Sequence, residues 1–272
     1  MKHSGEMEDL VRSLNAEQPV LRWRAAARLA EMGRISQAGV LAALASALDD
    51  EHPFVRWHAG VALSRAGSRQ AMALLTKALA EGSSLRQAAA ADALGQARKP
   101  DTAPLLRALD SVHSLVRHSA IEALVRQRER KLAPRLAGLL ADPSPGVRRA
   151  AAGALASMGD ERATGPLTER FKDESPLVRR SAAYALGALR ACPALPALLN
   201  ALGDAEPSVR RNVAWALGRL AASSALPQLQ QLLSDPALDG EVAAEAAQAI
   251  RAITGGWRRT ELRSSRRPPD IA

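Results

Sequence analysis

The chain contains few aromatic residues for its size. Only two Phe, one Tyr and four Trp occur among 272 residues, although 47% of the residues are hydrophobic. A β-sandwich or an α/β core of this length uses many more β-branched and aromatic side chains. The hydrophobic residues here are mostly Ala and Leu, which favour helix. The composition therefore predicts an all-α protein.

Cysteine and long hydrophobic segments are also scarce. The single Cys192 excludes an internal disulfide framework and a Cys-rich metal centre. No segment approaches the roughly 18 uninterrupted apolar residues of a membrane span. Residues 1–10 lack the apolar stretch of a signal peptide. We therefore expect a cytoplasmic protein with no membrane partner.

Lysine is rare although the chain is basic. Lys and Arg together number 37 against 28 Asp and Glu, which gives a net charge of +9, yet only five of the basic residues are Lys. The planar guanidinium of Arg pairs bidentately with carboxylates. This bias favours specific ion pairs over a diffuse cationic surface.

A unit of about 31 residues is repeated along the chain. Each copy has an apolar residue, an Arg and an Ala-rich run that ends in Ala-Leu, as in PGVRRAAAGALASMG at 145–159. A degenerate eighth copy lies at 240–253, and a shorter apolar segment separates successive copies. Two short helices cannot bury their apolar faces alone, so the helix pairs must stack. The Arg residues of the seven clear copies are Arg22, Arg56, Arg86, Arg117, Arg148, Arg179 and Arg210.

The pattern Asp-x-x-Pro-x-Val-Arg followed by an Ala-rich run and Leu-Gly is carried by DESPLVRRSAAYALG (173–187) and DAEPSVRRNVAWALG (204–218). It resembles the HEAT-repeat family, and within it the short HEAT-like repeats of phycobilin lyases. The resemblance implies an αα-superhelix of about eight helix pairs over residues 1–254. Residues 255–272 break the pattern, and we expect a basic, flexible tail there.

An Asp precedes the Arg by six residues in four copies. The resemblance implies that these residues form a structural ladder that ties successive repeats, because carboxylate and guanidinium match bidentately. Loss of one ladder Arg is expected to lower stability by about 1–3 kcal/mol. The four pairs are Asp50/Arg56, Asp142/Arg148, Asp173/Arg179 and Asp204/Arg210.

The opposite face of the same helix predicts a binding surface. A helical wheel places Val147, Ala151, Ala154 and Leu155 on one buried side. The positions one and five residues after the ladder Arg point away from it, toward the concave floor of a stacked superhelix. Exposed Trp, Tyr and Arg favour a partner-binding face, although solvated side chains with cation–π pairing remain an alternative. These positions hold Trp23, Trp57, His118, Arg149, Arg180, Tyr184, Arg211 and Trp215.

Sequence motifs for chemistry are absent. No phosphate-binding loop, dinucleotide fingerprint, zinc-protease motif, Cys pair or nucleophile elbow occurs, so we assign no catalytic, cofactor-binding or metal-ligating residue. His118 and Glu122 lie at i and i+4, with Asp92 one repeat away. A metal or acid–base site could be built from them, but a surface ion pair is the simpler interpretation.

These patterns favour a non-catalytic scaffold or adaptor that binds a protein partner, with acidic groups, through the concave face. Two alternatives stay open. The repeat subtype suggests a subunit of a bilin lyase or a cofactor-maturation or assembly factor. The net charge of +9 and the Trp and Arg residues on one face suggest a nucleic-acid-binding protein.

Overall fold

The computed structural model describes residues 2–98, 101–127 and 132–255. In these residues the chain is 79% helical, with 16 α-helices and no strand. The all-α prediction is therefore confirmed. The chain divides into two compact units, residues 1–128 and 129–272, which are described separately.

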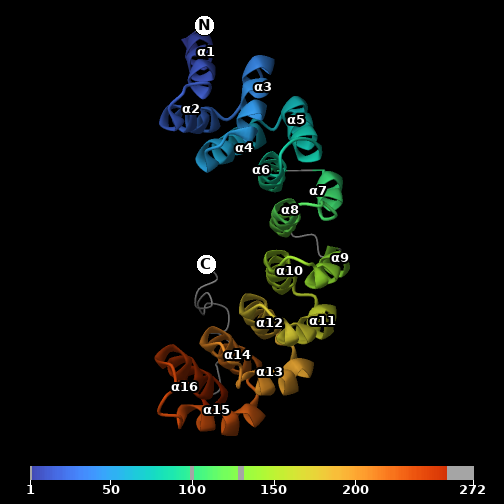
Figure 1. Ribbon diagram of the computed structural model, residues 1–272, viewed down its shortest axis with the longest axis vertical. Helices are drawn as coiled ribbons and strands as arrows, with labels where there is room; N and C mark the ends of the chain where they lie inside the picture. Colours follow the sequence, from blue (N-terminus) through green and yellow to red (C-terminus); the bar gives the residue numbers. More distant parts are fainter. Residues whose placement is uncertain (1, 99–100, 128–131, 256–272) are drawn as a thin grey trace. The chain divides into compact units, whose positions relative to one another are not determined.

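The first unit consists of four helix pairs (Figure 1). In each pair a helix with an odd number is followed by one with an even number. A short 3-10 turn, η1 (Ala47–Asp49), extends α3. The helices are α1 (Lys2–Leu14), α2 (Pro19–Met32), α3 (Ala38–Ser46), α4 (Pro53–Ala66), α5 (Arg69–Ala80), α6 (Ser84–Gln96), α7 (Ala103–Ala108) and α8 (Ser114–Arg126).

The second unit repeats this arrangement with shorter odd-numbered helices, which 3-10 turns extend at one or both ends. Its α-helices are α9 (Ala133–Gly138), α10 (Pro145–Met158), α11 (Thr164–Glu169), α12 (Pro176–Ala188), α13 (Leu195–Ala201), α14 (Pro207–Leu220), α15 (Leu226–Leu233) and α16 (Gly240–Thr254). The 3-10 turns are η3 (Leu139–Ala141), η4 (Glu161–Ala163), η5 (Arg170–Lys172), η6 (Cys192–Ala194) and η7 (Ser223–Ala225).

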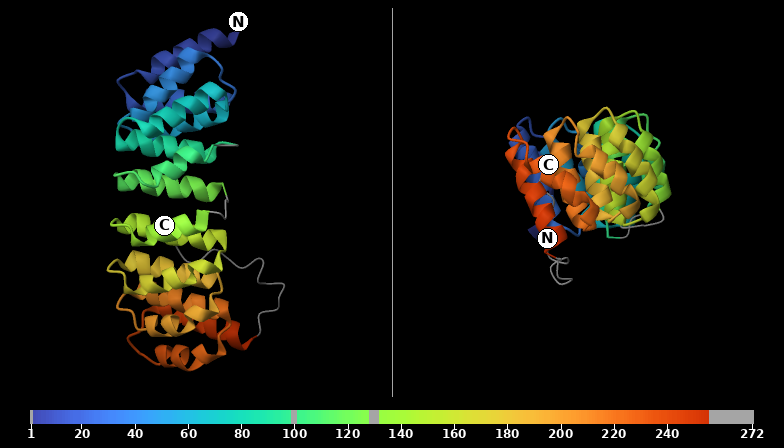
Figure 2. Two further views of the ribbon diagram at one scale, coloured as in Figure 1. Left: turned by 90° about the vertical axis from the view of Figure 1, so that its right-hand side faces the viewer. Right: turned by 90° about the horizontal axis from the view of Figure 1, so that it is seen from below.

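Within each unit the helices form two layers (Figures 1 and 2). Each even-numbered helix packs on the next even-numbered helix: α2 on α4, α4 on α6 and α6 on α8 in the first unit, and α10 on α12, α12 on α14 and α14 on α16 in the second. The odd-numbered helices cover the other side. Every even-numbered helix therefore has one face toward its partner layer and one face away from it.

Local sequence explains where the even-numbered helices begin and end. Five of them have Pro in the first turn, where a fixed φ suits the helix and the missing N–H is not needed. Gly67 follows α4 and Gly159 follows α10, both in the left-handed conformation that glycine adopts without strain. Proline and glycine thus set the repeat boundaries.

The predicted buried stripe is confirmed. Val147, Ala151, Ala154 and Leu155 are at most 3% exposed. Small residues let successive even-numbered helices approach closely, and a Cβ atom added to Gly95 would lie 2.5 Å from the Cα atom of Ala123. The Ala-rich composition therefore reflects tight helix stacking.

Two predictions about domain organisation are not decided by these observations. One continuous solenoid over residues 1–254 stays a prediction. The basic tail at 255–272 lies outside the described residues except for Gly255.

Candidate functional site

Ladder arginines bind a carboxylate of the following repeat. Arg148 donates from Nε and Nη2 to the two carboxylate oxygens of Asp173, at 2.8 Å each. Both side chains are buried, with exposed fractions of 8% and 3%. The same bidentate geometry joins Arg22 to Asp50 (2.7 and 3.1 Å) and Arg179 to Asp204 (2.7 and 2.9 Å).

Asp50, Asp173 and Asp204 belong to the ladder, but each carboxylate accepts from the Arg of the preceding repeat and not from the Arg six residues later. Arg148 donates from Nη1 to the backbone carbonyl oxygens of Asp142 and Pro143, at 2.9 and 3.1 Å. The carbonyl oxygens of Asp50, Asp173 and Asp204 accept in the same way from Arg56, Arg179 and Arg210. Each of these arginines thus uses Nη1 to bind backbone carbonyl oxygens of the turn that precedes its own helix. Where Nε and Nη2 also bind a carboxylate, that carboxylate belongs to the next repeat.

The ladder changes the acidity of its carboxylates. Burial alone raises the pKa of Asp173, but the hydrogen bonds from Arg148 and from the backbone N–H of Ser175 outweigh it, and the net pKa lies below the usual value. Asp204 has a lowered pKa for the same reasons. The ionised carboxylates are therefore stabilised in the folded chain.

The third repeat lacks the ladder. Helix α6 begins at Ser84, and the hydroxyl of Ser83 caps it by accepting the N–H of Arg86 at 3.2 Å. Counted from the helix start, Gln87 and not Arg86 takes the ladder position, and its amide reaches the carbonyl of Gly82 at 3.4 Å. Residue identity alone, which aligns Arg86 with the Arg of the other copies, conceals this one-residue shift.

This change affects Arg56 in the preceding repeat. Nη1 of Arg56 donates to the carbonyl oxygens of Asp50 and Glu51, at 2.7 and 2.8 Å. At the Asp position of the next repeat the chain has Glu81, which is exposed. Among the described residues, no carboxylate pairs with Nε and Nη2 of Arg56. This edge of the guanidinium therefore stays available.

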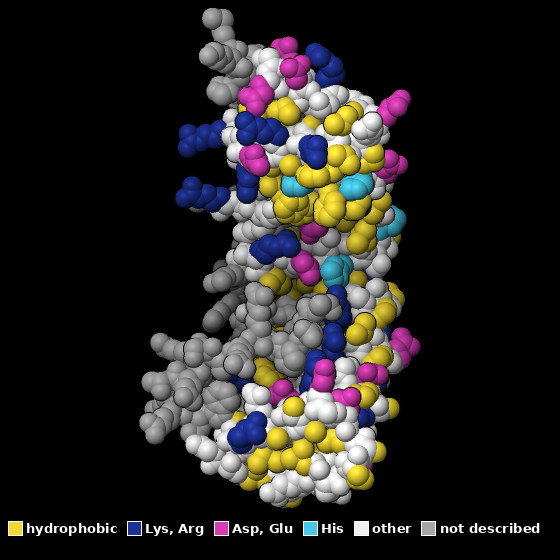
Figure 3. Space-filling model, turned by 90° about the vertical axis from the view of Figure 1, so that its left-hand side faces the viewer, with side chains coloured by type: hydrophobic (Ala, Val, Ile, Leu, Met, Phe, Trp, Pro, Cys, Tyr) yellow, Lys and Arg dark blue, Asp and Glu magenta, His cyan; other side chains and the backbone are white. Residues whose placement is uncertain are grey.

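Predicted binding residues of the first unit lie beside an exposed apolar surface. Trp57 is 52% exposed and contacts the His58 ring edge-on, at 4.6 Å between centroids. The half-buried Trp23 stacks on the same His58 ring, at 6.0 Å between centroids. Figure 3 shows hydrophobic and histidine side chains gathered on the face formed by the even-numbered helices of this unit. The large exposed side chains at its centre are Phe54, Trp57, Leu85 and Leu115.

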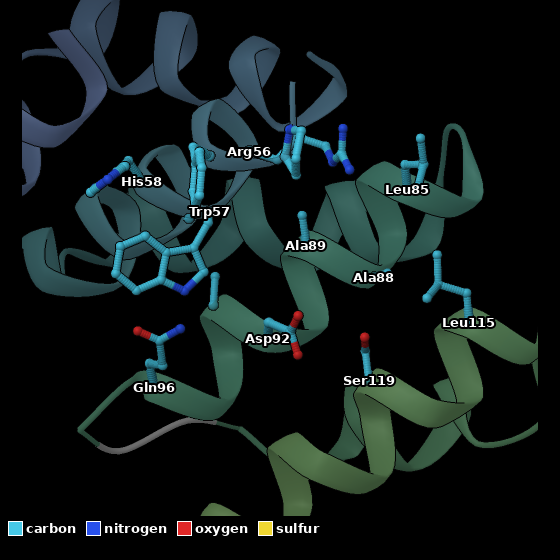
Figure 4. A pocket seen from close by; sticks show the side chains of 14 residues that line it. Arg56, Trp57, His58, Leu85, Ala88, Ala89, Asp92, Gln96, Leu115 and Ser119 are labelled. Atoms are coloured by element: carbon cyan, nitrogen blue, oxygen red, sulfur yellow. The ribbon is translucent and has the colours of Figure 1, made fainter. Parts of the chain in front are cut away.

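A pocket of about 570 Å³ opens among these side chains, between α4, α6 and α8 (Figure 4). Trp57 stands at one end and Leu115 at the other. Between them α6 presents Ala88 and Ala89, which are too small to fill the space. We call this space the α4–α6–α8 pocket. The sequence analysis did not predict this pocket, although the short side chains of α6 indicate space between the helices.

One acidic side chain lines the α4–α6–α8 pocket. Burial raises the pKa of Asp92 to about 6, although Arg126 and a hydrogen bond from Ser119 oppose the shift. Glu122 lies 4.0 Å from His118 and 3.6 Å from Arg126. His118 is half-buried. No group of three potential metal ligands occurs among the described residues.

The predicted binding residues of the second unit are less open. Tyr184 and Trp215 stack at 5.2 Å, and Arg219 lies 5.7 Å from the Trp215 ring. Arg211 forms an ion pair with Glu241 of the following repeat, and its side chain is only 12% exposed. The prediction that Arg211 is an open surface residue was therefore wrong, because the next helix covers it.

Arg149 and Arg180 are half-buried.

Across the parts of the chain that the structure describes, no helix combines the length and apolarity needed to cross a bilayer.

Comparison with known proteins identifies the repeat. The HEAT repeats family matches residues 7–95, 102–187 and 164–251. A search of curated proteins found no sequence match.

Among solved structures, the Escherichia coli protein YibA is similar with a TM-score of 0.67 and 20% identity, over 90% of this chain and 91% of YibA. An engineered protein gives a TM-score of 0.51 and 21% identity, over 91% and 78% of the two chains. Kap95p, described in its binding to RanGDP, gives 0.54 and 16%, over 91% of this chain and 45% of the other. These likenesses establish the fold, and the sequence matches establish that the chain belongs to the HEAT-repeat family.

Proposed function

We propose that this protein is a non-catalytic scaffold that binds a protein partner through the even-numbered helices of residues 1–128. The exposed cluster of Phe54, Trp57, Leu85 and Leu115 around the α4–α6–α8 pocket carries this proposal. The chain has only two Phe and four Trp, and one of each is more than half exposed here.

Exposing such an apolar cluster to water is unfavourable in free energy. Exposed apolar groups that lie together favour association, since burial contributes roughly 25 cal/mol for each Å² removed from water. Trp residues in preformed pockets also dominate many protein interfaces. A partner that covers Trp57 and Phe54 would gain this energy without any large rearrangement of the helices.

The proposal includes two finer features. We place the protein in the cytoplasm, and we expect its partner to present acidic groups. Arg56 lines the α4–α6–α8 pocket and carries positive charge. Kap95p, whose structure describes binding to RanGDP, supports the general use of this fold in protein binding.

Site-specific crosslinking tests the proposal. A photoreactive residue replaces Gln96, which lines the pocket and is exposed, and in a control it replaces the exposed Lys77 of α5 in the other layer. In extract of the native source we expect a protein adduct from position 96 and none from position 77. Trp57→Ala should abolish that adduct while the protein stays folded.

Two results would contradict the proposal. Equal adducts from both positions would indicate non-specific contact. A nucleic-acid adduct at position 96, with binding that weakens steeply as salt rises, would support the nucleic-acid alternative instead.

A further inference from the structure

Nε and Nη2 of Arg56 have no carboxylate partner among the residues that the structure describes. Arg22, Arg148 and Arg179 each place Nε and Nη2 against an Asp carboxylate, at 2.7–3.1 Å. Arg56 makes the same backbone hydrogen bonds through Nη1, so its guanidinium is held in the same way. Its Nε and Nη2 are therefore oriented for a carboxylate that no described residue supplies.

Arg56 also lines the α4–α6–α8 pocket, next to Trp57 in sequence. Figure 4 shows Arg56 and Leu85 along one edge of the pocket, with Asp92 and Ser119 toward the opposite edge. An apolar cavity and a carboxylate-binding group thus lie side by side. Arg210 has the same backbone hydrogen bonds and no carboxylate partner among the described residues, but it lies on α14, outside this pocket.

The dimensions favour a peptide segment over a small acid. Three successive helices line the pocket, and packed helices lie about 8–10 Å apart. A ligand that touches all three must extend over roughly 20 Å, which is about six residues of extended chain at ~3.3 Å per residue. The exposed Phe54 and Leu115 widen the apolar surface beyond what one small molecule would cover.

We infer that the α4–α6–α8 pocket recognises an acidic–apolar peptide segment of the protein partner. A large apolar side chain of the segment fills the space over Ala88 and Ala89, between Trp57 and Leu115. A carboxylate one or two residues away accepts two hydrogen bonds from Nε and Nη2 of Arg56. This inference rests on the proposed function and names the kind of partner that the site takes.

A random heptapeptide library displayed on phage and selected on the full chain supplies the probe. We expect selected sequences to contain Asp or Glu within two positions of Leu, Ile, Phe or Trp. The consensus peptide, labelled with fluorescein, is then titrated by anisotropy against the parent, Arg56→Gln, Arg56→Lys and Arg210→Gln.

Arg56→Gln should raise the dissociation constant at least about tenfold, since charge-assisted bidentate hydrogen bonds are lost. Arg56→Lys should retain only part of the affinity. Arg210→Gln removes an equivalent arginine outside the pocket and should change the constant less than twofold. A peptide with Asn or Gln in place of its acid should lose the same affinity, with no further loss on Arg56→Gln.

Several outcomes would overturn the inference. Selection of no peptide, selection of peptides without an acid, or equal binding by Arg56→Gln and the parent would each do so. Binding of octanoate in the absence of any selected peptide would show that the pocket takes a small acid. If position 96 still crosslinks a protein partner in any of these cases, the proposed scaffold function stands and only the acidic–apolar recognition fails.

Discussion

Replacing Arg148 with Ala should destabilise the protein more than the same replacement at Arg210. Both arginines donate from Nη1 to two backbone carbonyl oxygens, at 2.7–3.1 Å. Arg148 also binds a carboxylate of the next repeat, Asp173, whereas Arg210 has no carboxylate partner in the described part of the chain. The difference between the two variants therefore isolates the contribution of the carboxylate pair.

The size of the stability loss in Arg148→Ala follows from the burial of the ion pair. Asp173 is 3% exposed, and removing one partner of a buried ion pair costs about 3–5 kcal/mol. The backbone N–H of Ser175 still donates to Asp173 at 3.0 Å, and Arg170 lies 3.9 Å away, so the cost falls near the lower limit. We expect a loss of about 1 kcal/mol for Arg210→Ala. Arg148→Ala loses the carboxylate pair as well, about 3 kcal/mol more, so its total loss should be about 4 kcal/mol.

Urea denaturation followed by circular dichroism measures both losses under the same conditions. The pH dependence gives a second check. The folded pKa of Asp173 lies below its usual value, so the carboxylate stabilises the fold above about pH 4 and this stability is lost as pH falls through the folded pKa. The gap between the parent and Arg148→Ala should thus be full at pH 7 and shrink below about pH 4. Equal losses in the two variants, or a gap that does not change with pH, would refute the structural role of the ladder.

Three further predictions concern single sites. Burial raises the pKa of Asp92 to about 6, so ionisation of this carboxyl destabilises the fold as pH rises through that range. Melting curves should therefore show Asp92→Asn to be more stable than the parent at pH 8 and no more stable at pH 4. Gly187→Ala should lower stability by about 1–3 kcal/mol in urea titrations, since its Cβ atom would lie 2.7 Å from the Trp215 ring. Gly153→Ala should instead raise stability by about 0.5–1 kcal/mol, because a Cβ atom at this helical position meets nothing within 4 Å. Trp57→Ala should change the melting temperature little because the side chain is 52% exposed, while Trp215→Ala should lower it clearly; the reverse order would show that Trp57 belongs to the core.

The helix pairs could be predicted because their signals are local. Proline at the helix start, the Ala-rich run and the Leu near its end lie within one repeat. The helical wheel of α10 therefore predicted the burial of Val147 and Leu155, which are 1% and 0% exposed. Spacing along one helix is sufficient for this kind of inference.

Contacts between repeats were harder to predict. The spacing of six residues suggested that Asp142 pairs with Arg148, but the carboxylate that Arg148 binds comes from Asp173, 25 residues later. That choice depends on how successive helices stack, which the spacing does not encode. Arg211 looked open for the same reason, although Glu241 of the next repeat covers it.

The α4–α6–α8 pocket depends on both kinds of information. Its small residues, Ala88 and Ala89, are visible in the sequence, but only the neighbouring helices show that they form the base of a cavity. The missing ladder pair at Arg56 likewise required the true start of α6 at Ser84. A helix start is therefore a better guide to repeat register than the identity of a single residue.

The absence of a ladder pair between α4 and α6 has a mechanical consequence. A bidentate ion pair between adjacent repeats resists sliding of one helix along the next, because both hydrogen bonds lose their alignment together. Within residues 1–128, Arg22 and Asp50 supply this resistance between α2 and α4, whereas Arg56 has no equivalent partner at α6. Gln87 holds the ladder position of α6, so the junction of α6 and α8 lacks a bidentate ladder pair as well. Under bending or shear the first unit should therefore yield at the two junctions of α6 before that of α2 and α4. The same junctions form the walls of the pocket, so the surface best suited to receive a partner is also the most compliant part of its stack.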